Sequence, residues 1–333
     1  MCMYSSADGV ANDWHFVHLG SRAVGGAALV IAEATAVSPE GRISPGDAGI
    51  WGEQHVEPLA RITHFIKEHG AVPGIQIAHA GRKASAELPW KGGAHLKDEE
   101  GGWPTWAPSP VPFGADLWKV PNALSLPDIQ RVQKDFVAAA KRALAAGYEW
   151  LEIHAAHGYL AHEFLSPISN RRTDDYGGSF DNRVRFVIET VKAVRAAWPD
   201  RFPLAIRFSC SDWVEGGWTI EESVELARRV KAEGVDLVDC SSGGTTPDAK
   251  IPVGPGYQVP FAERIKKETG VLTAAVGMIT EPQQADKIIA NGQADIVLLA
   301  REFLRDPYWP YHAAKALGQR DRLVAPKQYG RAI

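Results

Sequence analysis

The segment Trp150-Leu-Glu-Ile-His154-Ala-Ala-His157-Gly-Tyr159-Leu places a short, largely apolar run directly before two imidazoles and a phenol. The run is typical of a buried strand, and the polar side chains follow at its carboxyl end. In α/β barrels the carboxyl ends of the strands carry the chemistry. Histidine and tyrosine side chains both donate hydrogen bonds and transfer protons. The segment therefore predicts an enzyme that holds a polar oxygen and delivers a proton close to it.

Apolar runs of this kind alternate with amphipathic segments of helical length along the whole chain. The predicted strands cover residues 28–34, 72–79, 150–154, 203–209, 235–241, 271–276 and 294–300. The predicted helices cover residues 14–24, 55–69, 126–146, 180–198, 220–233, 261–269 and 282–291. Near-continuous apolar strands that alternate with helices indicate a parallel sheet covered by helices. The fold class predicted is α/β, and the architecture is a (β/α)8 TIM barrel.

The alternation provides seven strands, whereas a (β/α)8 barrel has eight. The sequence opens at Met1-Cys-Met-Tyr4, which has the character of the end of a strand. We therefore expect the first strand to be truncated at the N-terminus, within one barrel domain that spans residues 1–333.

The segment 88–124 interrupts the alternation and is rich in Trp, Pro and Gly. Loops of this length are usually lids, binding loops or disordered segments. An ordered lid over the strand ends and a surface excursion packed on the barrel are both compatible with this composition.

The composition limits which binding partners and which cellular compartment are expected. The 333 residues carry a formal net charge of −4, which gives no reason to expect nucleic acid or an anionic membrane surface as partner. No apolar run approaches the roughly 20 residues that cross a bilayer. The three cysteines, Cys2, Cys210 and Cys240, cannot form a disulfide framework. A reducing, cytoplasmic location is therefore predicted.

Other strand ends carry polar residues that suggest a phosphorylated cofactor. Arg207 stands inside an apolar strand, where a guanidinium needs an anionic or carbonyl-rich partner. A structural ion pair with a buried acid is the alternative explanation. Gly243, Gly277 and Arg301 follow the late strands and resemble the phosphate-binding corner of barrels. No GxGxxG follows a strand, so a separate dinucleotide-binding domain is not expected.

The two histidines also admit a metal site, because imidazole is the commonest protein metal ligand. A metal-dependent TIM-barrel hydrolase or lyase would need further ligands on the later strands. Those strands offer mainly Arg, Ser and Gly, which favours an oxygen-binding role for His154 and His157 and leaves the metal site as the alternative.

Long stretches of the chain match one known family. They are Met1–Tyr4, Gly49–Trp51, Gly74–Lys83, His154–Tyr159, Ser169–Gly178, Asp239–Gly243 and Arg301–Pro307. On these stretches the chain resembles the Old Yellow Enzyme family of FMN-dependent ene-reductases, in particular its bacterial NADPH dehydrogenase and xenobiotic reductase branch.

The resemblance implies FMN at the strand ends and NADPH, or NADH, as a transient reductant. The residues that it places around FMN are Met1, Cys2, Ala34, Gln76, Arg207, Ser242, Gly243, Gly277, Ala300 and Arg301. Ala300 stands where the family usually has Gly, and Val276 stands where some xenobiotic reductases have Trp. A truncated relative that binds FMN weakly is a further alternative.

The resemblance also implies the reaction. His154 and His157 would hold the oxygen of an α,β-unsaturated carbonyl or nitro compound, which receives hydride from flavin N5 while Tyr159 supplies the proton. Tyr4 would contact the substrate. Arg331 would reach the site of a neighbouring subunit, which implies a homo-oligomer, either a dimer or a tetramer.

Overall fold

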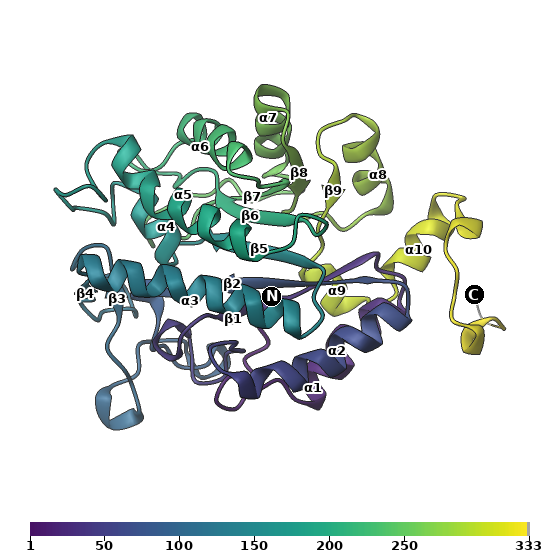
Figure 1. Ribbon diagram of the computed structural model, residues 1–333. Helices are drawn as coiled ribbons and strands as arrows, with labels where there is room; N and C mark the ends of the chain where they lie inside the picture. Colours follow the sequence, from purple (N-terminus) through teal and green to yellow (C-terminus); the bar gives the residue numbers. More distant parts are fainter. Residues whose placement is uncertain (332–333) are drawn as a thin grey trace.

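The structure is a computed structural model that describes residues 1–331. Its main sheet contains seven strands that are all parallel and lie in chain order, curled into an open barrel (Figure 1). The strands are β1 (Leu29–Ala36), β2 (Val72–Ala78), β5 (Trp150–Ala155), β6 (Leu204–Ser209), β7 (Leu237–Ser241), β8 (Leu272–Ala275) and β9 (Ile296–Val297). All seven coincide with predicted strands, although β9 is much shorter than expected. The predicted α/β barrel architecture is confirmed.

Helices cover the outside of the sheet. Those that match the prediction are α1 (Asp13–Val24), α2 (Val56–Glu68), α3 (Leu126–Ala145), α5 (Phe180–Ala197), α6 (Ile220–Ala232), α7 (Val259–Thr269) and α8 (Pro282–Ala290). Three short helices, α4 (Leu160–Leu165), α9 (Arg301–Arg305) and α10 (Trp309–Ala316), follow β5 and β9 and were not predicted. Within residues 1–331, every helix is too short or too polar to cross a membrane.

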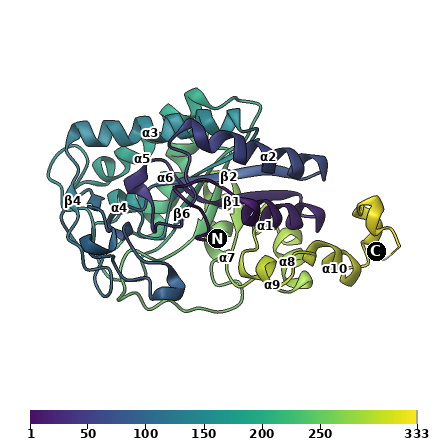
Figure 2. The same ribbon diagram turned by 90° about the horizontal axis from the view of Figure 1, so that it is seen from below.

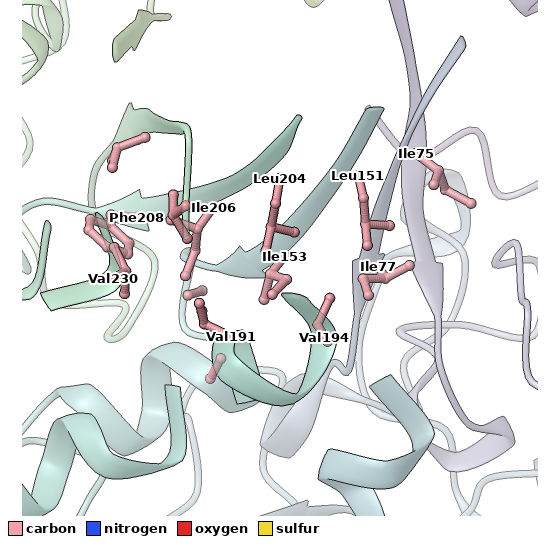
Figure 3. Packing of buried hydrophobic residues seen from close by; sticks show 14 of the residues in the cluster. Ile75, Ile77, Leu151, Ile153, Val191, Val194, Leu204, Ile206, Phe208 and Val230 are labelled. Atoms are coloured by element: carbon pink, nitrogen blue, oxygen red, sulfur yellow. The ribbon is translucent and has the colours of Figure 1, made fainter. Parts of the chain in front are cut away.

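The strands present alternate side chains to two different environments. Odd-numbered apolar residues of β2 and β5, such as Ile77 and Ile153, point outward toward α5, whose Val191 and Val194 belong to the same buried cluster (Figure 3). Successive side chains of a strand point to opposite faces, so the even-numbered residues of these two strands point into the barrel. The inward residues Gln76 and Glu152 are register partners on β2 and β5. The barrel interior therefore receives the polar residues of the strands.

The barrel is open between β1 and β9. These two strands occupy opposite ends of the sheet order, and in residues 1–331 they do not pair with each other. A cavity of about 360 Å³ lies along this opening and is lined by both strands. α1 and α9 lie near one another beside it, where Arg22 donates to the carbonyl of Phe303 at 2.7 Å (Figure 2). The unpaired edges of β1 and β9 thus border this cavity.

The segment 88–124 contains a small parallel sheet of β3 (Trp106–Ala107) and β4 (Asn122–Ala123). Its residues Val111 and Pro112 accept hydrogen bonds from the Arg82 guanidinium, which follows β2. The Phe113 ring lies 4.5 Å from the Lys83 ammonium. These contacts attach residues 111–113 to the carboxyl end of β2.

Shortening Leu151 to Ala should lower the free energy of unfolding by about 3 kcal/mol, because the side chain is fully buried in β5 and its loss leaves a cavity. Urea unfolding followed by circular dichroism measures the change. Val17→Ala is the control, since Val17 is 66% exposed and should change stability by less than about 0.5 kcal/mol. Equal effects of the two substitutions would show that β5 is not packed as described.

Candidate active site

The structure brings His154, His157 and Tyr159 together after β5. The His154 ring lies 5.2 Å from the His157 ring and 5.1 Å from the Tyr159 ring, measured between centroids and nearly perpendicular in both cases. His154 is the last but one residue of the strand, and Tyr159 caps the short helix α4. The strand end thus brings one imidazole and one phenol into contact with the His154 ring.

The environment keeps the His154 imidazole neutral. Burial lowers its pKa well below the usual value, and the charge of Arg207 lowers it further. The backbone N–H of Ala156 donates to His154 Nδ1 at 3.3 Å, which leaves this nitrogen as the acceptor. A neutral imidazole carries one proton, so in this tautomer the proton sits on Nε2. His154 can therefore donate a hydrogen bond from Nε2 to a bound oxygen.

The His157 imidazole is also neutral, because burial and Arg207 lower its pKa well below the usual value. Its Nε2 lies 2.7 Å from the Ser241 hydroxyl at the end of β7. The Ser241 hydroxyl also lies within donating distance of Gln258 Oε1, at 3.3 Å. When it donates to His157 Nε2 instead, the imidazole proton sits on Nδ1 and is available to a ligand. His157 itself has a φ of 59°, a left-handed conformation that is unfavourable for a residue other than glycine.

Tyr159 retains its proton. Burial raises the pKa of its phenol well above the usual value, and the nearby Cys2, Tyr4 and Asp47 raise it further. A protonated phenol beside two neutral imidazoles can act as a proton donor. The influence of Cys2 and Tyr4 shows that the N-terminal segment lies against the site.

Two polar residues of the barrel interior face the large cavity and are paired with buried acids. Gln76 Nε2 donates to Glu152 Oε1 at 2.6 Å, and Arg207 Nε lies 3.0 Å from Asp239 Oδ2. Burial raises the pKa of Glu152 to about 8, and burial also raises the pKa of Asp239. The ion-pair alternative considered for Arg207 is therefore present, yet the same side chain also lines the cavity.

Several of these buried atoms lack a hydrogen-bond partner within residues 1–331. They include Glu152 Oε2 and Asp239 Oδ1. Arg207 Nε and Asp239 Oδ2 form a close charge contact at 3.0 Å, but they are not aligned for a hydrogen bond. Buried polar groups normally have partners, so this arrangement suits a polar ligand in the cavity. Gln76 uses its amide N–H on Glu152 and keeps its carbonyl oxygen as an acceptor. The acceptor of Gln76 and the guanidinium of Arg207 line the same cavity, and together they fit the N–H and carbonyl edge of a flavin ring.

The loops after β7 and β8 are joined by Gln258. The Ser242 hydroxyl donates to Gln258 Oε1 at 2.7 Å, and Gln258 Nε2 donates to the Val276 carbonyl at 3.0 Å. Gly277 has a φ of 123°, and a Cβ there would lie 2.8 Å from Gln258 Nε2. Only glycine therefore fits this position without displacing Gln258.

The remaining residues expected around the cofactor lie at the same edge. Met1 and Ala300 line the large cavity. Ala34 lines a small cavity that also touches Tyr159. Gly243 has a φ of 73° in the loop after β7, and Arg301 is the exposed first residue of α9.

The N-terminal residues are fixed to β1 and to the segment 88–124. The backbone N–H of Met3 donates to the Glu33 carboxylate. The Tyr4 ring contacts the Trp90 ring edge-on at 6.2 Å between centroids. Burial raises the pKa of the Cys2 thiol, so this sulfur is not a thiolate at neutral pH.

Arg331 is not brought to the site of its own chain. It is exposed and follows a short turn, 327–329, beyond α10, where the C-terminal segment projects from the barrel (Figure 1). Its expected entry into the site of a neighbouring subunit stays a prediction.

Sequence analysis missed Glu152, Asp239, Ser241, Lys83 and Gln258 as site residues. The first three could have been found from the two-residue alternation, because Glu152 shares its strand face with His154 and Asp239 shares its face with Ser241. The roles of Lys83 and Gln258 depend on contacts between distant loops and leave no local signal.

A buried polar cluster supports the turn that carries the phenol. The backbone N–H of Gly158 donates to His162 Nδ1 at 2.9 Å, and His162 Nε2 lies 3.1 Å from Asp212 Oδ1. The Ser166 hydroxyl donates to the other Asp212 oxygen at 2.5 Å, and Thr245 Oγ1 donates to Oδ1 at 2.7 Å. Since His162 and Asp212 are completely buried, this cluster is structural.

The pKa of Asp212 reflects these contacts. Burial alone would raise it, but His162 and the hydrogen bonds from Ser166 and Trp218 lower it to about 2. The group thus stabilises the fold above its unfolded pKa of about 4, and this contribution is lost as the pH falls toward about 2.

Asp212→Asn should lower the free energy of unfolding by about 3 kcal/mol at neutral pH, because it breaks a buried hydrogen-bonded pair. Urea unfolding at a series of pH values measures the loss, which should shrink as the pH approaches about 2. Asp181→Asn is the matched control, since Asp181 pairs with Arg229 but is 70% exposed and should change stability by less than about 1 kcal/mol. A pH-independent difference would contradict the assignment.

Within residues 1–331, no three His, Cys, Asp or Glu side chains are grouped so as to hold a metal ion.

The chain is similar to known proteins over almost its whole length. The profile of the NADH:flavin oxidoreductase / NADH oxidase family matches residues 1–320. The NADPH dehydrogenase of Geobacillus thermodenitrificans is 48% identical over 333 residues, which cover 99% of this chain and 92% of that protein.

Solved structures are similar over almost the whole chain. Morphinone reductase in complex with tetrahydroNAD has a TM-score of 0.77 and 25% identity, and the match covers 98% of this chain and 87% of that one. The Old Yellow Enzyme homologue of Zymomonas mobilis shares the fold, with a TM-score of 0.76 at 24% identity over 97% of this chain and 87% of its own. The chain therefore belongs to the NADH:flavin oxidoreductase / NADH oxidase family and is an FMN-dependent oxidoreductase of the NADPH dehydrogenase type.

Proposed function

We propose that this enzyme uses NADPH, or NADH, to reduce the activated C=C bond of α,β-unsaturated carbonyl or nitro compounds. One observation carries the proposal: at the end of β5 a neutral imidazole and a protonated phenol both lie about 5 Å from the neutral His154 ring. Such a group of donors suits a substrate that presents one polar oxygen and accepts one proton. The bound tetrahydroNAD of morphinone reductase supports a nicotinamide as the reductant.

FMN, when bound, supplies the hydride that reaches the β-carbon of the substrate. Gln76 and Arg207 would hold the ring, and a guanidinium at that edge would stabilise negative charge that develops on reduction. Met1, Cys2 and Ala34 would lie beside the ring. The phosphate would be held by Ser242, Gly243, Gly277, Ala300 and Arg301.

His154 and His157 bind and activate the substrate. Their available N–H groups donate to the carbonyl or nitro oxygen and draw electron density from the conjugated C=C bond. Preorganised donors aimed at developing negative charge usually supply a large part of catalysis. Tyr4, whose ring contacts Trp90, would contact the substrate.

Tyr159 completes the reduction. Its phenolic proton passes to the α-carbon, and the O–H bonding electrons remain on the phenol oxygen. Because the pKa of this phenol is raised, the proton is present at neutral pH and is released only to a strongly basic carbon.

We further propose that residues 1–333 form one barrel domain, that the enzyme is a cytoplasmic homo-oligomer, and that Arg331 enters a neighbouring site. The exposed position of Arg331 on the projecting C-terminal segment supports its contact with a second subunit. The absence of disulfide bonds at Cys2, Cys210 and Cys240 supports the reducing location.

The direct experiment is purification with added FMN, followed by anaerobic reduction with NADPH and reoxidation with 2-cyclohexenone. A yellow protein that bleaches with NADPH and regains its colour with the enone is the expected result. A protein that binds no FMN would instead support the truncated relative with weak FMN binding. Bound zinc without flavin would support the metal-dependent hydrolase or lyase.

His154→Ala should weaken the binding of phenol-type ligands about thirtyfold, because the lost hydrogen bond to a charged oxygen stabilises the complex by about 2 kcal/mol. Titration of the flavin absorbance with a phenol measures the dissociation constant. His312→Ala is the control, since His312 is exposed and pairs with Asp306 in the segment that follows β9. Unchanged affinity in His154→Ala would contradict its role.

Tyr159→Phe should slow flavin reoxidation by 2-cyclohexenone about a hundredfold, as expected for loss of a general acid. Flavin reduction by NADPH should change little, since that half-reaction needs no proton from Tyr159. Stopped-flow absorbance measures both rates. Equal slowing of the two half-reactions would count against a role as proton donor.

A further inference from the structure

Lys83 is a cation beside the phenol that the mechanism above does not use. It ends the short turn Gly81–Lys83 that follows β2, and it is partly buried. Its ammonium donates to the carbonyl of His157 at 2.9 Å and to the carbonyl of Gly244 at 3.0 Å. The same nitrogen lies 5.2 Å from the centroid of the Tyr159 ring. Lys83 thus joins three segments at the site.

The two carbonyls that Lys83 binds belong to a close contact between loops. His157 and Gly158 both have positive φ values, 59° and 71°. A Cβ on Gly158 would lie 2.1 Å from the Gly244 carbonyl oxygen, so the two backbones touch. Carbonyl oxygens that face each other repel, and an ammonium between them compensates this repulsion. Lys83 therefore helps to hold the unfavourable turn that presents Tyr159.

We propose that Lys83 is the positioning residue of Tyr159: it fixes the turn that carries the phenol, and its charge stabilises the phenolate formed on proton transfer. This inference rests on the proposed function. In that step the phenolic O–H bond breaks and a C–H bond forms at the α-carbon. The electron pair stays on the phenol oxygen, and water later returns a proton to it.

The Lys83 ammonium lies 5.2 Å from the centroid of the Tyr159 ring, over which the charge of a phenolate is partly delocalised. A unit charge about 5 Å away in a partly buried site changes a rate by roughly a hundredfold. The cation over the Tyr159 ring face also interacts favourably with the aromatic system, and it lies 4.5 Å from the centroid of a second ring, Phe113.

The surroundings make this charge sensitive to pH. Burial lowers the pKa of Lys83 to about 8, while Glu163 of α4 raises it and Arg82 of the same turn lowers it. The other titratable groups around it are His154 and His157 of the β5 end, both neutral, and Tyr159. Lys83 is therefore charged below about pH 8 and loses its charge as the pH rises through this value.

The test compares Lys83→Met and Lys83→Arg with the parent holoenzyme. Stopped-flow absorbance measures reoxidation by 2-cyclohexenone and reduction by NADPH from about pH 6 to about pH 10, a range that brackets the lysine titration. Lys119→Met is the matched control, because Lys119 is also mostly buried and binds Ser85 and the Trp103 carbonyl outside the site.

We expect the parent reoxidation rate to fall as the pH rises through about 8. Lys83→Met should be about a hundredfold slower at neutral pH and should lack this fall. Lys83→Arg should recover most of the rate and remain active to about pH 10, because arginine stays protonated. Lys119→Met should behave like the parent. An unchanged rate in Lys83→Met, or a fall near pH 8 that persists in Lys83→Arg, would overturn the proposal.

Amide hydrogen exchange provides a readout that does not depend on activity. Lys83→Met should exchange faster than the parent at residues 156–160, and Lys119→Met should not. A parent that binds FMN but is never reoxidised by the enone would refute the proposed function alone, and the exchange result would still decide whether Lys83 holds the turn. Unchanged exchange at residues 156–160 would refute the positioning role.

Discussion

The alternation of side chains along parallel strands is the constraint on which the rest of this structure depends. Each strand of the sheet has to satisfy two environments at once, because its neighbouring residues point to opposite faces. On β5, Leu151 packs outward against the helices while Glu152 and His154 point into the barrel. A shift of one residue in register would bury the polar set among the helices and expose the apolar set to the cavity. Stability and function therefore require the same register.

Polar side chains inside a barrel lose their contacts with water, which costs free energy. This chain offsets the cost by pairing some of these side chains and by keeping its histidines uncharged. Gln76 binds Glu152, and Arg207 lies beside Asp239, so neither side chain enters the interior alone. The two histidines avoid the cost of a buried charge by remaining unprotonated near the guanidinium. Glu152 and Asp239, which keep carboxyl oxygens without a hydrogen-bond partner, line the cavity that a polar ligand can enter. The pairs thus stabilise the barrel interior, which still offers polar atoms to a ligand.

The turn after β5 shows how an unfavourable backbone is maintained. His157 adopts a left-handed conformation that costs of order 1 kcal/mol or more. Two contacts support the turn. His162, which is paired with Asp212, accepts from the Gly158 N–H, and the Lys83 ammonium donates to the His157 carbonyl. This support keeps Tyr159 beside the two imidazoles, which is the arrangement that proton transfer requires.

The sequence by itself determined the elements of the sheet, because these depend on local patterns. Apolar periodicity located all seven strands, and it placed His154 and His157 at the carboxyl end of one strand and Arg207 inside another. The tertiary structure alone decided which groups pair inside the barrel and that β1 and β9 leave an opening between them. It alone placed Lys83 over Tyr159, since contacts between loops that are distant in sequence arise only when the sheet curls.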